Sequence, residues 1–124
     1  MRPYGGAWSG PMFVLTHHPE DAKAVHGWTV LGGTLAEAIT AAREAADGKA
    51  VEIHSASLAS QGLDAGLVDE VHVHVTPVIL GQGVRVFSRE GPGPMLRFER
   101  VSADTHDEVG DPRTEVSLVY RPVR

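Results

Sequence analysis

The chain has 124 residues, of which 42% are hydrophobic and 22% are charged, and its formal net charge is −5 at pH 7. This length predicts one domain, 1–124, and the composition is that of a globular protein. An acidic balance without a basic cluster excludes an electrostatic basis for nucleic-acid binding, and no apolar run reaches the roughly 20 residues of a membrane helix. The absence of cysteine excludes disulfides and thiolate metal sites and fits a cytoplasmic protein.

The first part of the chain predicts two short strands behind an irregular lead-in, residues 1–11, which holds three glycines and two prolines. Met12–Leu15 is a continuous apolar run, typical of a strand that is buried on both faces. A polar connection, residues 20–27, leads to a second short strand at Trp28–Leu31.

The middle of the chain predicts two helices with a strand between them. Thr34 and Glu37 have the spacing of a capping box, so a helix begins after Thr34 and ends near Gly48. Its apolar stripe is expected to be Leu35, Ala38, Ile39 and Ala42. A strand follows at Ala50–Ile53. Ser55 or Ser57 then caps a second helix, about Leu58–Ala65, which Gly66 ends.

The last half of the chain reads as β-structure. Val71, Val73 and Val75 alternate with His72, His74 and Thr76, which predicts one strand with an apolar and a polar face, and Pro77 ends it. Further strands are expected at 84–87, at 96–103 with a bulge near 99–100, and at 115–120, the last two forming a hairpin around a polar turn at 105–113. The order predicts an α/β fold: a mixed, mainly parallel central sheet with flanking helices and a C-terminal antiparallel hairpin.

The stretch Gly66–Phe87 carries Gly-Leu-Val-Asp-Glu before the strand and Pro-Val-Ile-Leu-Gly-Gln-Gly after it. It resembles the dihydrofolate-reductase-like family, in particular the reductase domain of bifunctional riboflavin-biosynthesis deaminase–reductases, and the resemblance extends over about Gly10–Arg124. It implies an NADPH-dependent reductase acting on a small pteridine-like or ribosylaminopyrimidine molecule, such as 5-amino-6-(5-phosphoribosylamino)uracil. Family members carry a preceding segment with a mid-sheet strand, so we expect either a contracted sheet or a homodimer in which a partner completes it.

The resemblance also implies where NADPH would bind. It assigns Thr16 and His17 to the adenosine phosphate. The pyrophosphate would meet the start of the second helix, and glycines would border the nicotinamide. The family's Gly-Gly turn reads His54-Ser55 here, which brings side-chain bulk to the pyrophosphate. The cofactor-binding residues expected on this basis are Thr16, His17, Ser55, Ala56, Ser57, Gly81 and Gly83.

Two alternatives stay open. In the first alternative, the chain is a catalytically degenerate member of the family that serves as a small-ligand-binding or accessory dimeric protein. The changed Gly-Gly turn favours this alternative. A minor alternative is a metal site built from His54, His72 and His74, because three imidazoles plus water form a known zinc arrangement. We expect no metal, however, since His-x-His at this strand occurs in the resembling family as polar lining. Asp69 and Glu70 are expected to be structural, and no catalytic acid is assigned.

Overall fold

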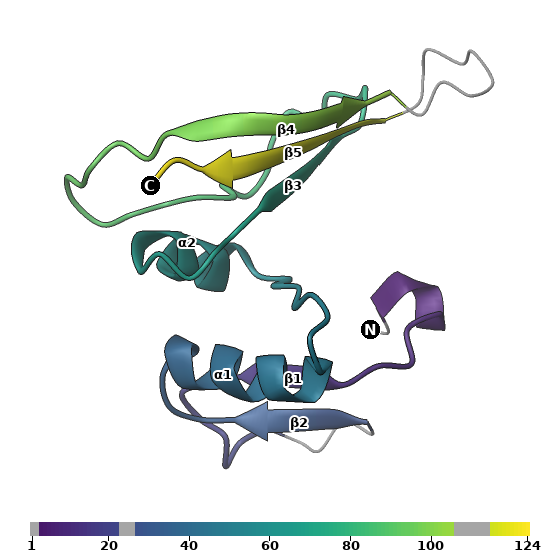
Figure 1. The fold of residues 1–124 in the computed structure, drawn as a ribbon, viewed down its shortest axis with the longest axis vertical. Coiled ribbons are helices and arrows are strands. Elements are labelled where there is room, and N and C mark those ends of the chain that lie inside the picture. The colour runs from purple at the N-terminus through teal and green to yellow at the C-terminus, as the bar shows by residue number, and fades with distance from the viewer. Residues whose placement is uncertain (1–2, 23–26, 106–114) are drawn as a thin grey trace. The chain divides into compact units, whose positions relative to one another are not determined.

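The computed structural model describes residues 3–22, 27–105 and 115–124, which fall into two compact units, Met1–His54 and Ser55–Arg124 (Figure 1). Residues 23–26 of the connection expected at 20–27, and residues 106–113 of the turn expected at 105–113, lie outside the described residues. The first unit contains a parallel strand pair and one helix, and the second contains a helix and an antiparallel sheet. The predicted mixed α/β fold with its C-terminal antiparallel hairpin is therefore confirmed. The described strands form two sheets, a parallel pair and an antiparallel trio, instead of the one mainly parallel central sheet that was predicted.

The first unit is built on two parallel strands, β1 (Met12–Leu15) and β2 (Trp28–Leu31), both at their predicted bounds. Helix α1 (Leu35–Ala46) packs against β1. The lead-in contains a short 3₁₀ turn, η1 (Pro3–Gly6). All four residues of the predicted apolar stripe of α1 are half-buried, while Glu37 on the same helix is exposed.

The predicted capping box at the start of α1 is present. The Glu37 backbone N–H donates to Thr34 Oγ1 at 3.2 Å, and the Thr34 backbone N–H donates to Glu37 Oε2 at 2.8 Å. Gly33 precedes the box with φ +96°, and a Cβ there would lie 2.5 Å from Glu37 Oε2, so this position requires glycine. The helix ends on Asp47 in the left-handed region, followed by Gly48.

The capping box makes the stability of the first unit sensitive to acid. The hydrogen bond from the Thr34 backbone N–H lowers the pKa of Glu37 below its ordinary value of 4.5. This stabilisation is fully present above the ordinary value and is lost as the pH falls through the lowered one. We expect the melting temperature of Glu37→Gln, measured by circular dichroism, to fall less between neutral pH and pH ~3 than that of the wild type, because glutamine keeps the bond without titrating.

The matched control for this experiment is Glu44→Gln, near the other end of the same helix. It is expected to lose stability on acidification as the wild type does. An identical acid response of Glu37→Gln and the wild type would contradict the role given to the capping box.

The second unit consists of one helix and a three-stranded sheet in the order β3-β5-β4, with both pairs antiparallel (Figure 1). A register shift between Arg100 and Ser102 confirms the predicted bulge. Ser55 takes the helix N-cap, with its Oγ accepting from the Leu58 backbone N–H at 3.3 Å. The elements of this unit are α2 (Ala56–Asp64), β3 (Val71–Val75), β4 (Phe98–Asp104) and β5 (Val116–Pro122).

Two predicted strands are wrong. Neither Ala50–Ile53 nor Val84–Phe87 is assigned to a strand, although all eight residues lie in the described part of the chain. A strand exists only when a neighbouring backbone completes its hydrogen-bond ladder. Neither segment has a ladder partner among the described strand pairs. Both therefore run as irregular chain in spite of their apolar pattern.

Burial in the second unit is concentrated on α2. Leu63 is 8% exposed and is the most buried large hydrophobic residue that the structure describes. On β3, Val71 and Val73 are half-buried while His72 and His74 are exposed, which confirms the predicted two faces over this part of the strand. Val75, which was predicted on the apolar face, is exposed. None of the described helices is long and apolar enough to cross a membrane.

Candidate functional site

Helix α2 begins at the turn predicted for a pyrophosphate. The first backbone N–H groups of any α-helix have no intrahelical acceptor and attract anions. Here the Leu58 N–H is taken by Ser55 Oγ, and the Ser57 hydroxyl lies 3.2 Å from the Ser55 hydroxyl. The structure thus brings Ser55 and Ser57 together at a helix N-terminus. The backbone N–H groups of Ala56 and Ser57 could donate to a phosphate oxygen.

The other two groups of predicted cofactor residues lie on loops. Thr16 follows β1, its N–H donates to Leu31 O at 3.0 Å, and its Oγ1 accepts from the His18 N–H at 3.1 Å. His17 is exposed beside it. The position of Gly81 favours glycine because its φ is +77°. Gly83 has no positive φ of this kind, and there is open space where a Cβ would lie. Thr16 and His17 belong to the first unit, and the remaining predicted residues belong to the second.

The imidazoles on β3 have separate partners. His72 Nε2 lies 3.1 Å from Glu70 Oε2, and His74 Nδ1 lies 2.8 Å from Ser117 Oγ. The bonds from His72 and Arg121 lower the pKa of Glu70, which keeps its carboxylate charged in a cross-strand ion-pair network. Each histidine is thus engaged in its own surface hydrogen bond. This arrangement fits the interpretation of polar lining.

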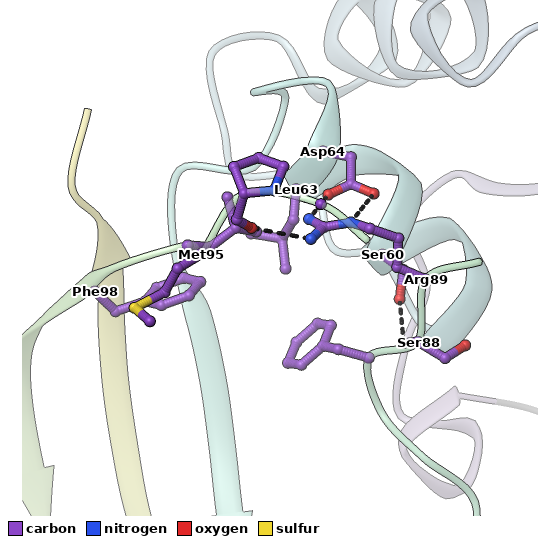
Figure 2. Close-up of a pocket in the computed structure, with 11 residues that line it drawn as sticks. Ser60, Leu63, Asp64, Ser88, Arg89, Met95 and Phe98 are labelled. Carbon is purple, nitrogen blue, oxygen red and sulfur yellow. Dashed lines mark hydrogen bonds and ion pairs between the residues drawn. The ribbon is translucent and has the colours of Figure 1, made fainter. Parts of the chain in front are cut away.

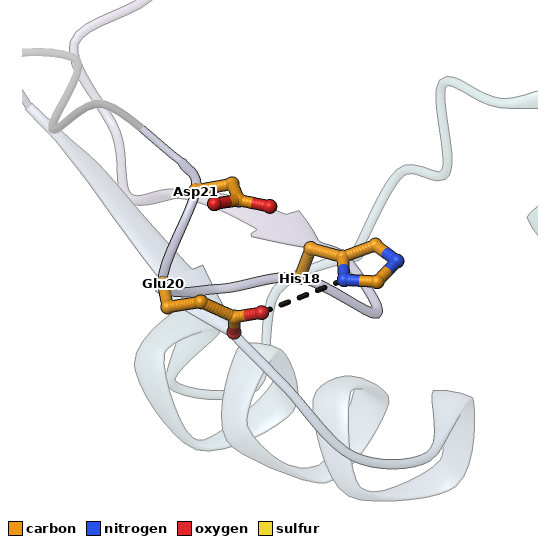
Figure 3. Close-up of side chains that lie close together, drawn as sticks. All are labelled: His18, Glu20 and Asp21. Carbon is orange, nitrogen blue, oxygen red and sulfur yellow. Dashed lines mark ion pairs between the residues drawn. The ribbon is translucent and has the colours of Figure 1, made fainter.

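A different set of metal-capable side chains meets in the turn after β1. In the described part of the chain, His18, Glu20 and Asp21 each place one ligand atom within 4.8 Å of the others (Figure 3). His18 Nδ1 lies 3.5 Å from Glu20 Oε1. All three side chains are exposed and come from one short segment. Such clusters are ordinary at protein surfaces, so this one does not by itself define a metal site.

A pocket that sequence reasoning missed lies within the second unit. Its volume is about 430 Å³, in the size range of small-molecule sites. Figure 2 shows Ser60, Leu63 and Asp64 of α2 on one side and Met95 and Phe98 on another. The complete lining is Ser60, Leu63, Asp64, Phe87, Ser88, Arg89, Gly93, Pro94, Met95, Leu96 and Phe98.

An ion pair forms the polar wall of this pocket. Arg89 Nε donates to Asp64 Oδ2 at 3.2 Å, Nη2 donates to Asp64 Oδ1, and Nη1 donates to Pro94 O at 2.9 Å (Figure 2). The guanidinium lowers the pKa of Asp64, and the carboxylate raises that of Arg89. Both groups therefore stay charged and hold the loop after Phe87 against α2. Because 25 positions separate Arg89 from Asp64, no local sequence pattern predicts this ion pair.

The first unit holds a second feature that sequence reasoning missed. The Tyr4 hydroxyl donates to Glu52 Oε2, and the same oxygen lies 3.0 Å from His54 Nε2. The rings of Tyr4 and His54 meet edge-on with centroids 6.0 Å apart. The bond to Glu52 raises the pKa of Tyr4, so its hydroxyl remains a donor.

These observations define a mixed α/β domain with a serine-capped helix N-terminus suited to an anion. Residues 8–109 match the RibD C-terminal domain family, so the chain belongs to that family. No curated protein matches the chain.

Two of the solved structures that share the fold differ in how much of their length this chain covers. A putative riboflavin biosynthesis protein from Shewanella sp. PV-4 has a TM-score of 0.72 and 20% identity, over 95% of this chain and 63% of that one. Acinetobacter baumannii RibD has a TM-score of 0.53 and 20% identity, over 91% of this chain and 38% of that one. This chain therefore spans less than two thirds of either relative.

Proposed function

We propose that this chain is an NADPH-dependent reductase of the riboflavin-biosynthesis type that acts on a ribosylaminopyrimidine in the cytoplasm. The observation that carries the proposal is the family match over residues 8–109 together with the serine-capped N-terminus of α2 at the expected pyrophosphate position. NADPH supplies the hydride when it is bound. The protein's part is to hold and orient the cofactor.

The residues present fit a pyrophosphate. Ser55 and Ser57 supply hydroxyls at the start of a nine-residue helix, and its dipole favours an anion there. Thr16 and His17 are proposed for the adenosine phosphate, and Gly81 and Gly83 for the edge of the nicotinamide. In this proposal the first backbone N–H groups of α2 replace part of what the missing Gly-Gly turn would provide.

Removing one backbone donor tests the proposal. Ala56 is the first helical residue and follows Ser55, whose extended φ of −161° and ψ of 126° suit a residue before proline. Ala56→Pro therefore removes one N–H while keeping the helix, because proline is well tolerated at this position. Since a hydrogen bond to a charged group is worth about 1.5–3 kcal/mol, NADPH affinity is expected to fall about 10-fold or more in a fluorescence titration.

Helix content measured by circular dichroism serves as the control and is expected to stay unchanged. Equal NADPH affinity of Ala56→Pro and the wild type would exclude the α2 N-terminus as the phosphate site. A wild-type chain that binds no NADPH at millimolar concentration would exclude the reductase function.

One observation favours the alternative of a binding or accessory protein. Ser55 Oγ already occupies the Leu58 N–H, so a phosphate would meet fewer donors than at an uncapped helix. This alternative predicts a folded chain that binds a small ligand without oxidising NADPH. Measuring NADPH oxidation by the wild-type chain with the proposed substrate separates the two functions.

We also propose that the chain forms a homodimer. The loop at 78–84 exposes Ile79 at 98%, Leu80 at 80% and Val84 at 89%. Nearly complete exposure of adjacent large aliphatic side chains is unusual for a monomeric surface and is typical of an interface.

A further inference from the structure

The connection between β3 and β4, residues 76–97, is long for a compact unit. All of its residues are described, and none of them belongs to a helix or a strand. Connections of more than roughly 12–15 residues without secondary structure are uncommon and are usually functional. This one carries Gly81 and Gly83, the two glycines proposed for the edge of the nicotinamide. The contacts that hold the connection in place therefore matter for cofactor binding.

The first half of this connection has few attachments of its own. Among the described residues, no hydrogen bond joins 79–87 to another element. Ile79 and Val84 are 98% and 89% exposed, and nothing lies within 4 Å of the place where a Cβ would stand on Gly81 or Gly83. The position of this segment therefore depends on what holds its two ends.

The second end of the segment is bound to α2 (Figure 2). The Ser88 backbone N–H donates to Ser60 Oγ at 3.3 Å. Arg89 donates to the Asp64 carboxylate through Nε, at 3.2 Å, and through Nη2. Ser60 and Asp64 are four positions apart, so they lie on the same face of the helix. Two consecutive residues of the connection are thus bound to one face of α2.

The guanidinium of Arg89 also binds a later part of the connection. Its Nη1 donates to Pro94 O at 2.9 Å, so one planar group joins α2 to both parts of the connection. A Cβ on Gly93 would lie 2.5 Å from Arg89 Cδ and 2.7 Å from its Cζ, so the glycine leaves the space that this side chain occupies. Lysine cannot make the same set of bonds, because its ammonium lacks the planar fork of arginine.

We propose that Arg89 is a positioning residue for the nicotinamide, because it joins the connection to α2 and thereby holds the segment that carries Gly81 and Gly83. The inference rests on the proposed reductase function. In this role Arg89 does not touch the cofactor. It acts by preorganisation, since a segment that already has its binding arrangement loses less conformational freedom when the cofactor enters. The adenosine phosphate, proposed for Thr16 and His17 of the other unit, does not depend on this segment.

The variant Arg89→Met tests this role, because methionine removes the fork but keeps an unbranched side chain. In calorimetric titrations of the full chain, NADPH affinity is expected to fall about 10-fold, the factor for a segment that has its binding arrangement about a tenth of the time. The affinity for adenosine 2′,5′-bisphosphate, which lacks the nicotinamide, is expected to stay unchanged. Arg89→Lys is expected to give an intermediate NADPH affinity, because its ammonium keeps the charge without the fork.

The matched control is Arg100→Met, at an exposed arginine on β4, and it is expected to bind both ligands as the wild type does. Gly93→Ala is a second test variant. Its methyl group displaces the guanidinium without removing a charge, so it is expected to weaken NADPH binding and to leave bisphosphate binding unchanged.

The outcomes separate this inference from the proposed function. Equal NADPH affinity of Arg89→Met and the wild type would overturn the inference and leave the reductase function standing. An equal loss of affinity for NADPH and for the bisphosphate would mean that Arg89 has only a general structural role, and it would overturn the inference as well. A wild-type chain that binds no NADPH would overturn the proposed function and this inference together.

A second measurement needs no cofactor. Nitrogen-15 relaxation reports the order parameters of the backbone amides on the picosecond-to-nanosecond timescale. The order parameters of Gly81 and Gly83 are expected to be lower in Arg89→Met than in the wild type, while those of β3 stay the same. Equal order parameters of the two glycines in both proteins would show that the Arg89 fork does not hold this segment, and would overturn the inference.

Discussion

Replacing Leu63 by alanine is expected to lower the free energy of unfolding of this protein by about 2–5 kcal/mol. Leu63 is 8% exposed, it lies on α2, and it lines the pocket that Phe87 and Phe98 also border. The side chain therefore lies on the wall of the pocket between the helix, the loop and β4. No other large side chain of the described residues is buried, so little packing exists to compensate for the cavity.

Urea denaturation followed by circular dichroism measures this loss. The matched control is Leu67→Ala, because Leu67 follows the same helix but is 37% exposed, and its truncation is expected to cost clearly less. Equal losses for the two variants would show that Leu63 does not anchor the second unit.

Introducing charge into the loop at 78–84 is expected to convert the proposed homodimer into a monomer. In the double variant Ile79→Asp, Leu80→Asp, each copy loses two side chains that are 98% and 80% exposed in the isolated chain. Burying such a side chain contributes about 1.5–3 kcal/mol, and two copies contribute twice. The substitution also places like charges opposite each other, so dimers are expected to disappear at micromolar concentration.

Sedimentation velocity over a range of protein concentrations checks this result. Val123→Asp, an exposed valine outside the loop, is the control and is expected to remain dimeric. If the wild-type chain sediments as a monomer at every concentration, the homodimer proposal is wrong.

Local sequence signals predicted the elements whose ends are defined by neighbouring residues. The capping box of Thr34 and Glu37 fixed the start of α1, and alternation across His72 and His74 fixed β3 and its exposed face. These features depend on hydrogen bonds or faces that span at most a few residues. They are accordingly visible in a single sequence.

Features that depend on distant partners were not predictable in the same way. Ala50–Ile53 has the composition of a strand, but strand formation depends on a ladder partner elsewhere. The Tyr4–Glu52 bond joins residues 48 positions apart, and Arg89–Asp64 joins residues 25 apart. The cofactor residues were inferred from family resemblance, and the structure places them in two units.

Strand β4 has a consequence for how the protein behaves in concentrated solution. Its only ladder partner among the described strands is β5, and all seven of its residues are exposed. Such an edge is a template for strand addition, the route to amyloid-like association. Glu99, Arg100 and Asp104 place charges along it, and the bulge after Arg100 interrupts its regular spacing. These charges and the bulge oppose the pairing of β4 with the edge strand of another molecule.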